Sequence, residues 1–72
     1  MVLSRFFFQK SMIEPEFVRL RLVQNNVHLD WTNDITFATH NSSKYAAKKH
    51  LKSLQANFKL SDTVTIVEME RK

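Results

Sequence analysis

Residues 17–31, with the sequence FVRLRLVQNNVHLDW, decide the fold because two alternating apolar patterns flank a pair of asparagines. In the first pattern, Val18, Leu20 and Leu22 alternate with other residues, as in a strand that buries one side. The pair Asn25-Asn26 offers a two-residue turn, because asparagine tolerates the left-handed backbone that tight hairpins need. We therefore expect an antiparallel hairpin.

The turn also predicts how the two strands pair. A hairpin closed on Gln24 and Val27 places apolar residues opposite one another on one face and opposite charges on the other face. The expected pairs are Leu22 with Leu29, Leu20 with Trp31, and Arg21 with Asp30. A shift by one residue would lose all three matches, so this register is the prediction.

Working outward on both sides completes the secondary structure. Residues 4–13 are rich in aromatic residues and predict a strand, which a turn at Pro15 joins to the hairpin. Residues 34–38 indicate either a single helical turn or an irregular crossing. Residues 44–58 predict a helix, and residues 63–70 predict a strand that is apolar on both sides and therefore central or covered.

The predicted helix is amphipathic. Ser42 or Ser43 is a good N-cap, because a serine hydroxyl can accept a hydrogen bond from a free amide of the first turn. Four apolar residues fall within a narrow arc and predict the side that packs on the sheet. They are Ala47, Leu51, Leu54 and Phe58.

These elements predict an α+β fold of order β-β-β-α-β in a single domain over residues 1–72. It comprises a three-stranded antiparallel meander, one amphipathic helix, and one final strand that a right-handed crossover returns to the same sheet. One helix covers only one face of a four-stranded sheet, so the helix is expected to pack on one face and to leave the other uncovered.

The uncovered face should carry an aromatic ring. Consecutive strand residues point to opposite sides, so at least one ring of the run Phe6–Phe8 points away from the helix. Either a loop caps that ring or, in the interpretation we favour, Phe7 anchors an interface together with Val67 and Met69. With Val23 on the same face, the patch is typical of a surface hidden in a homodimer or against a partner.

Composition excludes several functional classes. The 72 residues include neither glycine nor cysteine, which excludes glycine-rich phosphate loops, disulfides, zinc ribbons and thiol nucleophiles. His28, His40 and His50 lie too far apart in the sequence for a metal-binding pair. No segment resembles a signal peptide or a membrane span. We therefore expect a cytoplasmic protein with no membrane partner, no cofactor, no metal and no enzymatic activity.

Positive charge gathers in the second half of the chain. The formal net charge is +4, and the charges of residues 1–43 sum to zero. The predicted helix has a basic side with one ring for stacking, made of Lys44, Tyr45, Lys48, Lys49 and Lys52. Arg19 and Arg21 add charge from the sheet. This pattern indicates a surface that contacts phosphates, or alternatively one that is only solvated.

Four segments give the chain a resemblance to known proteins: WTNDI at 31–35, AT at 38–39, LQANF at 54–58 and VTIVE at 64–68. Over residues 27–69 it resembles a group of small phage and prophage proteins from Gram-positive bacteria. The resemblance implies an accessory protein of a mobile element that acts by binding inside a bacterial host. Such proteins regulate transcription or inhibit a host defence system, including CRISPR nucleases, and the resemblance carries no site residues.

The sequence therefore predicts a non-enzymatic interaction protein that binds a host macromolecule, with a host protein or a second copy of the chain as partner. Its lysines would steer it toward an acidic surface. The alternative is a sequence-tolerant nucleic-acid-binding protein that uses the basic side of the helix. The predicted partner-binding residues are Lys44, Tyr45, Lys48, Lys49, Lys52, Arg19, Arg21, Phe7, Val67 and Met69.

Overall fold

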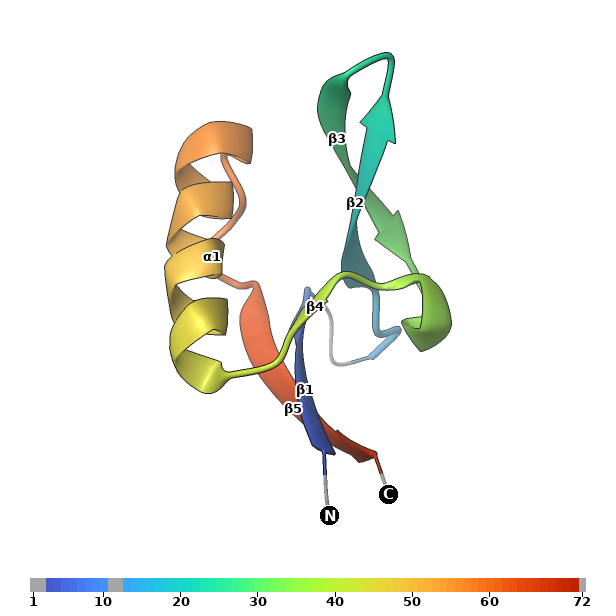
Figure 1. The fold of residues 1–72 in the computed structure, drawn as a ribbon, viewed down its shortest axis with the longest axis vertical. Helices are drawn as coiled ribbons and strands as arrows, with labels where there is room; N and C mark the ends of the chain where they lie inside the picture. The colour runs from blue at the N-terminus through green and yellow to red at the C-terminus, as the bar shows by residue number, and fades with distance from the viewer. Residues whose placement is uncertain (1–2, 11–12, 72) are drawn as a thin grey trace.

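One helix and a five-stranded antiparallel sheet make up residues 3–10 and 13–71, the part of the chain that the computed structural model describes (Figure 1). The strands are β1 (Leu3–Gln9), β2 (Phe17–Val23), β3 (Asn26–Thr32), β4 (His40–Asn41) and β5 (Thr65–Arg71), and α1 (Lys44–Phe58) is the helix. The predicted α+β class is confirmed. The two-residue strand β4 is an addition that the sequence does not predict.

Strand β1 is the central strand of the sheet. One of its edges pairs with β5 along the whole strand, from Leu3 opposite Arg71 to Gln9 opposite Thr65. Its other edge pairs with β4 in the middle and with β2 at the end. Within the described residues β5 pairs with β1 alone, so of the two alternatives predicted for the last strand, central or covered, the central one is excluded. The central position falls to the aromatic strand, whose run Phe6–Phe8 is buried on both faces.

The β2–β3 hairpin forms as expected, but its turn lies one residue earlier in the chain. Gln24 and Asn25 are the turn residues, and both have the positive φ that a tight hairpin needs, at 50° and 66°. Asn26 instead belongs to β3, where it pairs with Val23. The sequence does not predict the left-handed conformation of Gln24, because this conformation is unfavourable for most residues other than glycine and asparagine.

The predicted register of the hairpin is wrong by two residues. Leu22 pairs with Val27 rather than with Leu29. A shift by two keeps every side chain on its own face, so the apolar residues of both strands still share one face. The predicted attraction between Arg21 and Asp30 also survives, because Arg21 Nη2 reaches Asp30 Oδ2 diagonally at 3.0 Å.

Helix α1 covers the face of the sheet that we call the inner face (Figure 1). Ser43 is the N-cap, and its hydroxyl accepts a hydrogen bond from the Ala46 amide at 3.1 Å. The helix ends at Phe58, before Lys59 in the left-handed conformation. The four predicted core residues of the helix pack as expected in the inner core, which contains Phe6, Phe8, Val18, Ala47, Leu54 and Val64, with Leu51, Phe58 and Ile66 partly buried against them.

The opposite face, which we call the outer face, has a small core of its own. Phe7 points to this face and is only 4% exposed, because it packs with Phe17, Ala38 and Ile35. Ile35 belongs to the 3-10 helix η1 (Ile35–Phe37), which resolves the two alternatives left open for this segment. Of the two predictions for the outward ring, the structure shows the covered one.

Asp34 and Thr39 fix the path of η1 over the outer face. Asp34 Oδ1 accepts from the Thr36 amide at 3.0 Å and from the Thr36 hydroxyl at 2.6 Å. These hydrogen bonds stabilise the carboxylate and hold the pKa of Asp34 below its ordinary value. Thr39 is tied to β2, since its amide donates to the Val18 carbonyl and its hydroxyl accepts from the Leu20 amide.

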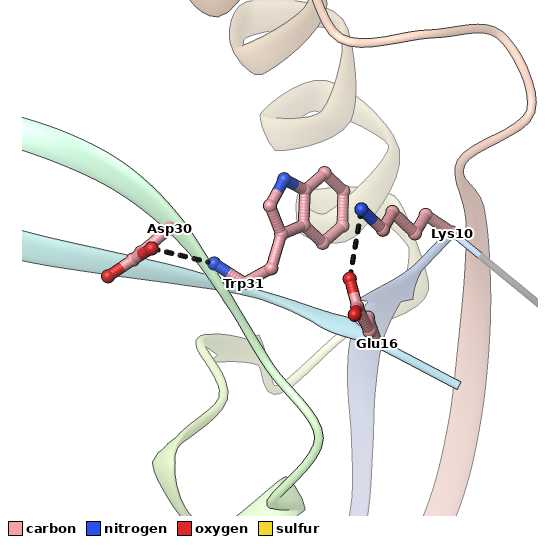
Figure 2. Close-up of polar contacts among 4 residues, drawn as sticks. All are labelled: Lys10, Glu16, Asp30 and Trp31. Atoms are coloured by element: carbon pink, nitrogen blue, oxygen red, sulfur yellow. Dashed lines mark hydrogen bonds and ion pairs between the residues drawn. The ribbon is translucent and has the colours of Figure 1, made fainter. Parts of the chain in front are cut away.

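A polar cluster joins the end of β1 to the start of β2 (Figure 2). Lys10 Nζ lies 2.9 Å from Glu16 Oε2 and 4.5 Å from the centre of the Trp31 ring. The Trp31 amide donates to Asp30 Oδ1 at 3.1 Å. Lys10 and Glu16 therefore neutralise each other. The cluster links the end of β1 to β2 and β3 and leaves neither of these two charges unpaired.

Candidate functional site

The lysines of α1 form an exposed row along one side of the helix. Lys44, Lys48 and Lys52 follow one another at intervals of four residues, which is about 6 Å per step along the helix axis. Lys49 lies 5.6 Å from the exposed Tyr45 ring. No carboxylate in residues 3–10 or 13–71 makes an ion pair with any of these four lysines. Their charges therefore face solvent uncompensated.

The lysine row lies away from the β4 side of the helix. His50 marks the β4 side, because its Nδ1 atom lies 3.1 Å from Asn41 Oδ1 and its ring packs edge-on against Phe8. At 100° per residue, Lys48 falls on the opposite flank from His50. The row is consequently open to solvent on the side away from the hairpin.

Arg19 and Arg21 do not join this basic row. Both lie on the outer face of β2, opposite in register to β3 residues of that face, whereas α1 covers the inner face. The Arg19 guanidinium lies 5.5 Å from the centre of the Phe37 ring, and Arg21 is paired with Asp30. The structure therefore places the predicted basic residues on two opposite sides of the sheet.

The three apolar residues predicted for partner binding do come together. Val67 lies opposite Phe7 in the β1–β5 ladder, and Met69 lies opposite Arg5, so all of these side chains share the outer face. Met69 is 37% exposed and Val67 is half-buried, while the Phe7 ring is covered. Val23, also predicted for this patch, lies apart from it at the far end of β2.

A shallow hollow of about 360 Å³ opens on the outer face between η1 and the β1–β5 pair. Its lining residues are Arg5, Phe7, Ile35, Thr36, Met69 and Glu70. The hollow therefore contains two of the predicted partner-binding residues, Phe7 and Met69. The described residues bring no acidic group within ion-pair distance of the half-buried Arg5.

Sequence reasoning missed Arg5 and the η1 side of the hollow. Alternation along β1 could have found Arg5, because a residue two positions before Phe7 shares its face. Thr36 could not be found in this way, since its position depends on how the segment between β3 and β4 crosses the sheet. Arg5 is the one positively charged residue of the six that line the hollow.

Comparisons with known proteins identified no relative of this chain. A scan against family models, a search of curated proteins and a search of solved structures each found no match to the chain. Among the described residues, no group of three or more histidine, aspartate or glutamate side chains is placed to hold a metal ion. The same residues contain no helix with the length and apolar character that crossing a bilayer requires.

Proposed function

We propose that the chain is a non-enzymatic interaction protein that binds a protein partner through the outer face of its sheet. The observation that carries this proposal is the outer hollow, in which Met69 and the half-buried Arg5 border the covered ring of Phe7. Methionine, arginine and aromatic residues are the types enriched at protein interfaces, where a few of them supply most of the binding energy.

The biological setting proposed for this binding rests on the resemblance to small phage and prophage proteins. On that basis, the partner is a macromolecule of a bacterial host, and binding inhibits a defence system or modulates a regulator. The net charge of +4 supports an acidic partner. The lysine row of α1 would accelerate association through long-range attraction without lying in the contact itself.

The test is partner capture from a host lysate with matched variants. Met69→Gln removes an apolar side chain at the hollow, and Leu22→Gln makes the same kind of change on the hairpin, where Leu22 is 72% exposed. We expect a specific protein to be captured by the native chain and by Leu22→Gln, and to be lost with Met69→Gln. Circular dichroism of each variant separates lost binding from lost folding. Capture that is indifferent to Met69 would contradict the proposal.

A second candidate function is supported by the lysine row, whose side chains are exposed and unpaired among the described residues. A spacing of about 6 Å per step suits successive phosphates, and Tyr45 offers a ring for stacking. Lysines contact phosphates without reading bases, so such binding would tolerate any sequence.

Oligonucleotide binding at about 50 and 200 mM salt tests this second function, because multiple phosphate contacts lose orders of magnitude in affinity over that range. The double variant Lys48→Glu, Lys52→Glu should abolish binding if the row is the site. The matched change Arg19→Glu, Arg21→Glu on the opposite side should leave most of it. Binding that is absent at both salt concentrations would eliminate the second function.

A further inference from the structure

We propose that the outer hollow binds the C-terminal residue of a partner protein, with Arg5 holding the terminal carboxylate and the apolar lining holding the side chain. This inference rests on the proposed function and names the chemistry that the interaction surface recognises. Capture of a chain terminus is a known mode of peptide recognition. Four features of the hollow support it.

The first feature is the charge of Arg5. Arg5 as a residue is half-buried, and the described part of the chain supplies its guanidinium with no ion-pair partner. A guanidinium can donate two parallel hydrogen bonds to a carboxylate. Such charge-assisted pairs are stronger than hydrogen bonds between neutral groups. A carboxylate ligand would therefore supply the counter-charge that this arginine lacks.

The second feature is the apolar surface directly beside this charge. Phe7 follows Arg5 by two residues on the same face of β1, about 7 Å along the strand. Ile35 and Met69 line the hollow on either side of β1. Because Phe7 is only 4% exposed, the accessible apolar surface is mainly that of Ile35 and Met69. An apolar side chain seated against them would lose contact with water, which stabilises the complex in proportion to the area buried.

The third feature is size, which favours a terminal residue over an internal acidic one. A volume of about 360 Å³ lies at the small end of the range for binding sites. In a C-terminal residue the side chain and the carboxylate branch from one Cα, so a single residue can reach both Arg5 and Met69, which lie opposite each other in the β1–β5 ladder. An internal aspartate or glutamate would need a second residue to fill the apolar part.

The fourth feature is that the η1 side of the hollow is already formed. Asp34 accepts two hydrogen bonds from Thr36, and Thr39 ties the end of the segment to β2. Binding would then require little ordering of the backbone, which otherwise reduces affinity.

Glu70 borders the hollow, but its side chain belongs to the other face of the sheet. Glu70 lines the hollow and is exposed, yet it lies opposite Ser4 in the β1–β5 ladder, whereas Met69 lies opposite Arg5. Since successive strand residues point to opposite faces, its carboxylate leaves the sheet on the side away from Arg5. Removing the charge of Glu70 should therefore change binding little, whereas removing the charge of Arg5 should weaken it.

The experiment is a nuclear magnetic resonance titration of the full chain with three small probes. N-acetylleucine carries both the carboxylate and the side chain, N-acetylleucinamide carries the side chain alone, and acetate carries the charge alone. We expect N-acetylleucine to shift the Arg5 Nε–H and Met69 methyl signals with saturation, and to do so at concentrations where the other two probes do not.

Three variants measure the electrostatics of the same titration. Arg5→Gln should weaken N-acetylleucine binding by about tenfold or more, since it removes a charge-assisted pair of hydrogen bonds. Glu70→Gln should change binding by less than about twofold, because this exposed charge lies on the other face of the sheet. Arg21→Gln is the matched control, because Arg21 lies on the same face outside the hollow, and it should change nothing.

Several results would overturn the proposal. Equal binding of the amide and the acid would remove the role of the carboxylate, and equal binding of acetate would remove the role of the side chain. A loss of binding in Glu70→Gln as large as that in Arg5→Gln, or no binding by any probe, would also overturn the proposal. If Met69→Gln still loses its protein partner in these cases, the interaction surface stands and only the recognition of a chain terminus is wrong. If Met69→Gln is also neutral, both proposals are wrong.

Discussion

Replacing Phe7 by leucine tests whether this ring is packed in the small core of the outer face or is a free contact for a partner. The structure shows Phe7 4% exposed, with its ring centre 6.2 Å from that of Phe17 in an edge-on arrangement and 5.5 Å from that of His40. Leucine keeps an apolar side chain at the position but removes both ring contacts. The change therefore isolates the aromatic part of the packing.

The expected loss follows from these two contacts. An aromatic pair contributes about 0.5–1.5 kcal/mol beyond its buried area, so two pairs predict a loss of about 1–3 kcal/mol for Phe7→Leu. A chain of 72 residues has a total stability of about 4–11 kcal/mol at 0.05–0.15 kcal/mol per residue. The variant should consequently fold, but with a visibly lower stability.

Urea unfolding monitored by circular dichroism measures this loss. With a slope of about 1 kcal/mol per molar urea for a chain of this size, the midpoint should fall by about 1–3 M. Tyr45→Leu is the matched control, because Tyr45 is 74% exposed on α1 and its replacement should change the stability by less than about 0.5 kcal/mol. If the two variants were equally stable, the packing of Phe7 against Phe17 and His40 would be refuted.

Three further predictions concern local structure. Ser43→Ala removes the N-cap of α1 and should lower the free energy of unfolding by about 1 kcal/mol in urea titrations, whereas Ser42→Ala should not. Gln24→Asn should raise the thermal midpoint slightly, because asparagine tolerates the φ of 50° at this turn position better than glutamine does; a lower midpoint would contradict the turn. The folded-state pKa of Asp34 lies below its ordinary value of 3.8, so the ionised carboxylate stabilises the fold above that value and the contribution is lost as the pH falls through the lowered pKa. The unfolding midpoints of the native chain and of Asp34→Asn should differ at neutral pH and converge on acidification. A difference that does not change with pH would show that the ionised Asp34 carboxylate makes no contribution to stability.

The features that follow from periodicity could be predicted from the sequence. Ala47 and Leu54 recur at helical spacing, and they are the buried residues of α1. The hairpin strands were assigned the correct faces for the same reason, although their register was not. An alternating pattern is unchanged by a shift of two residues, so only the turn could distinguish the two registers, and Gln24 takes a conformation that its residue type disfavours.

The features that depend on tertiary placement could not be predicted. Apolar residues on both sides of β5 left a central and a covered strand as alternatives, and only the tertiary structure shows that, within the described residues, β5 pairs with β1 alone, with Ile66 partly buried against the inner core and Val67 half-buried on the outer face. Arg19 and Lys48 both carry positive charge, yet only the position of α1 reveals that they face opposite ways. The sequence could not reveal the hollow for a related reason, because Ile35 and Thr36, which line it, belong to a segment that has no periodic pattern.

The pairing of β1 with β5 has a consequence for how the chain acquires its structure. These strands pair along their whole length, from Leu3 opposite Arg71 to Gln9 opposite Thr65. This part of the sheet therefore depends on contacts between residues that lie far apart in the sequence. Such contacts slow folding, because a long loop must lose its freedom before they form. The β2–β3 hairpin and α1 are local and can form early. During synthesis, β1 therefore cannot pair with β5 until residues 65–71 have left the ribosome. The outer hollow, which Met69 helps to line, cannot form before then.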